Sequence, residues 1–203
     1  MAIDRTKYLD AGEAQRLRTT TEAWAITDLE RGARQGVVAW ALVDTAMLTG
    51  LRVNEIAQLR VSDLSSGRSS LHVHRTKRRR AVAETLAIPP ELVKHLRQFI
   101  DWKKFAGECT AVHSALFCGK RGPMTVSGMQ KLWKVAIKRA GLPRELSIHS
   151  ARHTMAVHLL AKTKNLKQVQ QQLGHSSPVV TANMYAQVQF NEMREGATRL
   201  YAG

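Results

Sequence analysis

The stretch "SSLHVHRTKRRRAVAETLAIPP" (residues 69–90) decides the fold class, because it is the one convincing hairpin in the sequence. Residues 69–75 alternate apolar and polar side chains, and residues 81–89 run back after a turn region, "TKRRR" (76–80). Alternation with a period of two is typical of a half-buried strand. With helical patterns elsewhere, the sequence predicts an α+β fold: a mostly helical single domain with a small antiparallel sheet.

Helical patterns occupy most of the chain on both sides of this hairpin. Asp10 with Glu13 forms a capping pattern, Gly50 and Gly141 end apolar runs, and Thr125 is a typical N-cap. No internal repeat or low-complexity linker interrupts the chain. Helices are expected from residue 11 onward and over 36–50, 53–60, 90–105 (opened by Pro89 and Pro90), 125–141, 149–162, 165–174 and 177–188, with a short strand at 115–119.

The charge of the chain requires an anionic partner. Its 203 residues carry 31 Lys and Arg against 16 Asp and Glu, a formal net charge of +15. Nucleic acid is the first candidate, since neutralised phosphates release counterions. A membrane surface would call for a basic amphipathic helix or a lipidation signal, and neither stands out; no segment approaches the roughly 18 apolar residues of a spanning helix. Cys109 and Cys118 make no disulfide framework, so we expect a cytoplasmic protein with reduced thiols, associated with the nucleoid when bound to DNA.

Two histidine pairs raise the alternative of a metal site. His149 and His153 have the i, i+4 spacing of two zinc ligands on a helix, and His72 and His74 share one face of a strand. The glutamate of the zinc-protease motif is absent, and no cysteine or carboxylate nearby is an obvious third ligand. The sequence therefore favours a site without metal.

Other polar residues have plain structural explanations when taken singly. Arg52 can be a surface residue facing Glu55 three positions on, and the basic run from Lys77 can be a solvated turn. His175 can cap a helix end, and Tyr185 can be a half-buried core residue. These residues indicate a function only if they belong to one pattern.

Four motifs in a fixed order form such a pattern: "TGLRVNEIAQL" (49–59), "HSARHT" (149–154), "LGHSS" (173–177) and "MYAQV" (184–188). Together they resemble the catalytic domain of the tyrosine recombinase (phage integrase) family, and the resemblance extends from about residue 8 to residue 188. It implies that family's catalytic fold over residues 1–188. It also implies a C-terminal tail, 189–203, that is exchanged between subunits or is simply frayed.

The resemblance implies a nucleophile and a phosphate clamp. Tyr185 would attack the DNA and store the broken bond as a 3′-phosphotyrosyl ester, which a 5′-hydroxyl can reseal without ATP. Arg52 and Arg152 would hold the nonbridging oxygens, since guanidinium groups stay charged and grip two oxygens.

Proton transfer falls to three further residues under the same resemblance. His149 would accept a proton or bind the phosphate, and His175 would donate to a nonbridging oxygen. Lys77 would protonate the departing 5′-oxygen, as the only lysine in a turn whose arginines are poor proton donors. The remaining basic residues of the hairpin are expected to contact DNA: Arg75, Arg78, Arg79 and Arg80. No metal or other cofactor is expected.

Three features depart from the family pattern. Ala151 stands where the family usually has leucine, and the interval from His175 to Tyr185, which contains Pro178, is one residue longer than usual. The chain also leaves no room for the N-terminal DNA-clamping domain. It is therefore either an excised catalytic domain or a short recombinase resembling the fimbrial-type invertases.

The expected partner is double-stranded DNA at a specific site, bound by a homo-tetramer on paired sites. A type IB topoisomerase-like relaxing enzyme and a catalytically inactive DNA-binding regulator are the alternatives.

Overall fold

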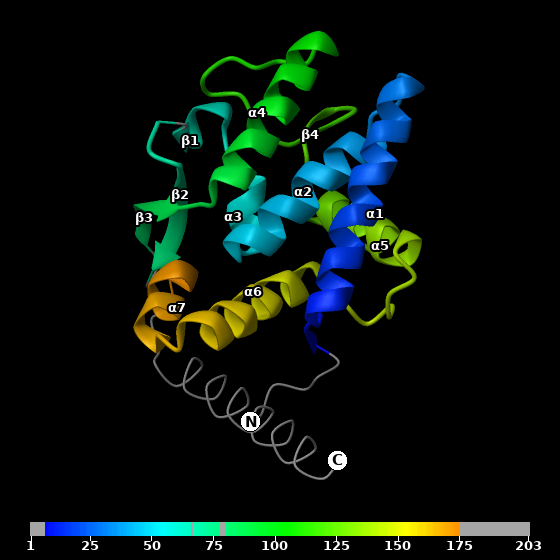
Figure 1. Ribbon diagram of the computed structural model, residues 1–203. Helices are drawn as coiled ribbons and strands as arrows, with labels where there is room; N and C mark the ends of the chain where they lie inside the picture. Colours follow the sequence, from blue (N-terminus) through cyan, green and yellow to red (C-terminus); the bar gives the residue numbers. More distant parts are fainter. Residues whose placement is uncertain (1–6, 66, 78–79, 175–203) are drawn as a thin grey trace.

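The predicted hairpin forms and organises the main sheet, although its strands extend into the predicted turn region 76–80 (Figure 1). This computed structural model describes residues 7–65, 67–77 and 80–174. Strands β2 (Ser70–Lys77) and β3 (Arg80–Ala87) pair antiparallel, and β1 (Leu64–Ser65) adds to the other edge of β2. Leu71 and Val73 are buried while His72 and His74 are exposed, so the alternation in the sequence sets the faces of β2.

Helices account for most of the remaining described residues, which confirms the α+β prediction. The capping predicted at Asp10, the left-handed Gly50 and the N-cap Thr125 are all present. The helices are α1 (Ala11–Glu30), α2 (Gln35–Thr49), α3 (Val53–Ala57), α4 (Pro90–Phe105), α5 (Val126–Arg139), α6 (Ile148–Thr163) and α7 (Leu166–Leu173). No described helix is both long enough and apolar enough to cross a membrane.

Two predicted elements are shorter than expected. Helix α3 ends at Ala57, because Arg60 leaves the helical path to form a β-bridge with Ala115. The strand expected at 115–119 is reduced to β4 (Cys118–Gly119), paired with β5 (Gly122–Pro123). The helix expected at 177–188 lies outside the described residues.

Helix α2 forms the centre of the molecule, with α1, α4, α5 and α6 packed around it (Figure 1). A second apolar cluster joins α6 to α7 through Leu160, Val169 and Leu173, and it includes Tyr8. Helix α3 contacts β2, α6 contacts α7, and Arg75 of β2 bonds to Gln172 of α7, so these four elements lie on one side of the molecule.

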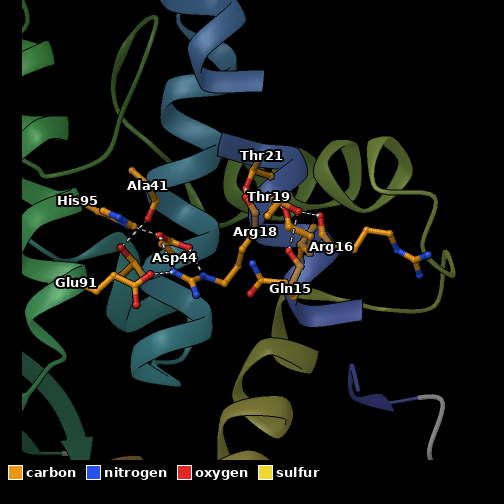
Figure 2. Close-up of polar contacts among 11 residues, drawn as sticks. Gln15, Arg16, Arg18, Thr19, Thr21, Ala41, Asp44, Glu91 and His95 are labelled. Carbon is orange, nitrogen blue, oxygen red and sulfur yellow. Dashed lines mark hydrogen bonds and ion pairs between the residues drawn. The ribbon is translucent and has the colours of Figure 1, made fainter. Parts of the chain in front are cut away.

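An ion network around the buried Asp44 fastens α1, α2 and α4 together (Figure 2). Asp44 of α2 is 1% exposed; its Oδ1 accepts from Arg18 Nε at 2.7 Å, and its Oδ2 lies 2.5 Å from His95 Nδ1. Arg18 also donates to Glu91 of α4. Burial opposes the charge of Arg18, but its hydrogen bonds to Asp44 and Glu91 outweigh burial and raise its pKa. The network therefore neutralises its own charges.

Candidate active site

Arg152 lies at the centre of the candidate site, on the buried face of α6. Its side chain is 8% exposed. Nη1 donates to the carbonyl oxygen of Gly50 at 2.7 Å, and Nη2 donates to that of Leu173 at 2.7 Å. Gly50 ends α2 and Leu173 ends α7, where helix carbonyls lack intrahelical partners. Arg152 therefore joins three helices and satisfies two of these carbonyls.

The charge of Arg152 is not neutralised by its surroundings. Burial, followed by the positive charges of Arg52 and Arg75, lowers its pKa to about 10, and only Glu55 acts in the opposite sense. A buried cation beside other cations gains from a bound anion. The site is thus electrostatically suited to phosphate.

Arg52 lies at the N-cap of α3 and reaches towards solvent, with its side chain 46% exposed. Its Nη1 donates to Glu55 Oε1 at 3.0 Å, and its backbone N–H donates to Glu55 Oε2 at 2.8 Å. Glu55 is 6% exposed. A buried carboxylate therefore holds both the backbone and the side chain of Arg52.

Glu55 is a residue whose role the sequence interpretation missed, since it was considered only as a surface partner of Arg52. The available signal was its position, three residues after an N-cap, where glutamate commonly accepts from the N-cap backbone.

His149 is exposed in the first turn of α6, one turn before Arg152. His153 is half-buried, and burial lowers its pKa, followed by the nearby charges of Arg152 and His149. Within the described ranges, no three His, Cys, Asp or Glu residues come together as a metal site.

The hairpin contributes to the same side of the molecule. Lys77 ends β2, where its partner across the strands is Arg80, the first residue of β3. Arg75 was expected to contact DNA, but its side chain is only 2% exposed and faces the interior with Leu71 and Val73. A side chain this deeply buried is not placed to contact DNA.

Arg75 instead bridges two elements. Its Nη1 donates to Glu84 Oε2 on β3 at 3.0 Å, and its Nη2 donates to the carbonyl oxygen of Gln172 on α7 at 2.8 Å. The structure thus brings Arg52 close to Arg152, which lies one turn after His149 on α6, beside the hairpin and the end of α7. The other predicted residues lie outside the described part of the chain: Arg78, Arg79, His175, Tyr185 and the tail 189–203.

Comparison with known proteins identifies the family. The model of the phage integrase family matches residues 7–192. The chain belongs to this family. Tyrosine recombinase XerD of Corynebacterium glutamicum is 30% identical over 156 residues, which cover 76% of this chain and 50% of that protein. The chain spans about half the length of the curated relatives it matches.

Solved structures of recombinases share the fold. The crystal structure of XerA recombinase matches with a TM-score of 0.75 and 25% identity, covering 95% of this chain and 62% of that one. The XerH site-specific recombinase, bound to a palindromic difH substrate in a post-cleavage complex, matches with a TM-score of 0.73 and 24% identity over 94% and 52% of the two chains. The predicted resemblance to tyrosine recombinases and their catalytic-domain fold is therefore confirmed.

Proposed function

We propose that this chain is the catalytic domain of a site-specific DNA recombinase, which cleaves and rejoins strands through a covalent 3′-phosphotyrosyl intermediate. The observation that carries the proposal is the un-neutralised Arg152, fixed between the ends of α2 and α7 with Arg52 beside it. Membership of the phage integrase family supports the same chemistry.

The two arginines act as the phosphate clamp. Arg152 has five N–H donors, and its bonds to Gly50 and Leu173 use two of them. Glu55 holds Arg52 through Nη1 and leaves the rest of a half-exposed guanidinium towards solvent. Both groups can donate to nonbridging oxygens, whose developing negative charge they stabilise in the transition state.

The other proposed catalytic residues move protons and form the covalent bond. Tyr185 attacks the phosphorus, and its phenolic oxygen replaces the 5′-oxygen of the next nucleotide. His149 accepts a proton or binds the phosphate, and His175 donates to a nonbridging oxygen. Lys77 gives its proton to the leaving 5′-oxygen. The ester conserves the energy of the broken bond, so the scheme needs neither metal nor ATP.

The proposed partner is double-stranded DNA carrying a specific recombination site, bound by four copies of the protein on paired sites. The net charge of +15 supports a DNA partner, as does the similarity to XerH, which is bound to its difH substrate. We propose residues 189–203 as the segment exchanged between subunits. A DNA-bound protein of this kind works in the cytoplasm, on the nucleoid.

The test is covalent capture of DNA from a random pool, in which the protein selects its own site. Short nicked duplexes of randomised sequence are incubated with the protein, and adducts that survive denaturant are isolated and their attached strands sequenced. We expect a defined sequence, whose best member then serves as a nicked suicide substrate. Tyr185→Phe should bind this substrate without forming an adduct, and Tyr201→Phe should form it normally.

Three results would contradict the proposal. An adduct that persists in Tyr185→Phe would mean a different nucleophile. Adducts without sequence preference, together with plasmid relaxation, would favour topoisomerase-like activity. Sequence-specific binding without any adduct would favour a DNA-binding regulator.

A further inference from the structure

Two buried arginines from different elements hold the carboxyl end of α7. Arg152 of α6 donates to the carbonyl oxygen of Leu173, and Arg75 of β2 donates to that of Gln172, at 2.7 and 2.8 Å. Carbonyls in the last turn of a helix carry the negative end of its dipole, which favours cations there. We call these two arginines, with Gln172, Leu173 and Gly174, the α7 junction.

Gly174 lets Arg75 approach the α7 junction. Its φ of +62° is left-handed, which favours glycine. A Cβ at this position would lie 1.9 Å from Arg75 Nη1 and 2.7 Å from its Cζ. The guanidinium therefore packs directly against the glycine backbone, and the next residue in the chain is His175.

The other end of Arg75 is fixed within the hairpin. Nη1 donates to Glu84 on β3 at 3.0 Å, so one guanidinium connects β2, β3 and α7. Arg75 precedes Lys77 by two residues on β2. Its Nε is buried and has no hydrogen-bond partner within the described residues, so Arg75 carries a desolvation cost that an apolar residue would not.

We propose that Arg75 is a positioning residue for strand cleavage, because it locks the hairpin to the end of α7, where Gly174 directly precedes His175 in the sequence. The inference rests on the proposed function, in which His175 donates to the scissile phosphate. A displacement of a phosphate ligand by about 1 Å costs about 10²-fold in rate.

Arg75→Lys tests the bridge, and Arg34→Lys is the matched control. Lysine has a single charged nitrogen and cannot reproduce the planar fork that reaches both Glu84 and Gln172. Arg34 also joins a carboxylate to a backbone carbonyl, donating to Glu108 and to the oxygen of Cys118, but it belongs to a different part of the molecule. Both variants lose a comparable connection between elements.

The first measurement is single-turnover cleavage of the nicked suicide substrate, normalised to the folded fraction from near-ultraviolet circular dichroism. We expect Arg75→Lys to cleave about 10²-fold more slowly and Arg34→Lys to stay within about threefold of the unmodified protein. Glu84→Gln weakens only one end of the bridge and should lie between them. If Arg75→Lys yields too little folded protein, the Glu84→Gln rate decides the question.

A second substrate separates a displaced phosphate ligand from a displaced general acid. Replacing the bridging 5′-oxygen by sulfur creates a leaving group that departs without being protonated. On this substrate Lys77→Ala should recover most of its rate, while Arg75→Lys should stay slow, because its defect concerns the phosphate ligand at residue 175. If the cleavage rate of Arg75→Lys recovered on this substrate, its defect would lie in the hairpin that carries Lys77, and the proposal that Arg75 acts through the end of α7 would be overturned.

The two proposals fail in different ways. If the unmodified protein forms no adduct with any duplex, the proposed function is wrong and the inference falls with it. If it forms the adduct and Arg75→Lys cleaves as fast as Arg34→Lys, only the positioning role of Arg75 is overturned.

Discussion

Arg18 and Arg152 are two arginines withdrawn from solvent, and their surroundings are opposite. Arg18 donates to Asp44 and Glu91, and these carboxylates raise its pKa despite burial (Figure 2). Arg152 donates to two neutral carbonyls, and burial together with neighbouring cations lowers its pKa to about 10. The first arginine has its counter-charge inside the protein.

The difference separates a structural charge from a functional one. A network that neutralises itself can fasten helices together but has nothing left for a ligand. Arg152 is also held by two hydrogen bonds, but their neutral carbonyl acceptors leave its charge available to an anion. A bound phosphate would supply the negative charge that the hydrogen-bond partners of Arg152 lack. Four predictions test this contrast, from the largest expected effect to the smallest.

Arg152→Ala should lower the rate of single-turnover cleavage by about 10³-fold, as expected when a transition-state donor is removed. The quench-flow rate of adduct formation on the nicked suicide substrate measures this effect. Arg18→Ala serves as the control and should retain the rate per folded molecule. Equal losses in the two variants would remove the distinction between the two arginines.

Arg18→Met should lower the free energy of unfolding by about 3 kcal/mol, because among the described residues it leaves the buried Asp44 with only His95 as partner. Urea unfolding followed by circular dichroism measures the loss. Arg18→Lys, which keeps the charge, should lose less. A loss below about 1 kcal/mol, the range of exposed ion pairs, would mean that the network does not fasten α1 to α2.

Phosphate should stabilise the protein through Arg152. At a concentration about ten times its dissociation constant, a bound ion adds about 1.4 kcal/mol to the free energy of unfolding. The measurement compares urea unfolding in phosphate and in chloride at equal ionic strength. Arg152→Met should lose the phosphate-specific gain and Arg18→Met should keep it; a gain of equal size in both variants would show that phosphate acts elsewhere.

His153 should make the protein less stable in mild acid, with the smallest effect of the four. Its pKa is lowered from 6.5 by burial and then by Arg152, so the unfolded chain takes up the proton first as the pH falls. Its contribution is complete above pH 6.5 and is lost as the pH falls through the lowered value. His153→Gln should flatten this part of the profile in urea titrations, and an unchanged profile would contradict the assignment.

Local rules were sufficient for most of the fold. Asp10 with Glu13, Gly50 at the end of α2 and Thr125 before α5 each act through neighbours in sequence, and all were predicted. Helix α3 ended early because Arg60 pairs with Ala115, a partner 55 residues further along the chain. Tertiary pairing of this kind leaves no local signal.

The sequence predicted which residues make up much of the site, but only part of how they are arranged. The motifs identified Arg52, His149 and Arg152, which the structure brings together, while Glu55 was overlooked as the carboxylate that holds Arg52. The alternation of "LHVHR" already put Arg75 on the face of Leu71 and Val73. Its partner Gln172, 97 residues away, could not be inferred from that pattern.

The most direct test of the proposed chemistry is to map the DNA-linked peptide. The trapped adduct is digested with nuclease and protease, and the modified peptide is sequenced by mass spectrometry. A nucleotide joined through its 3′-phosphate to Tyr185 is the expected result. A nucleotide on Tyr8, on Tyr201 or on any residue other than tyrosine would contradict a 3′-phosphotyrosyl mechanism at this site.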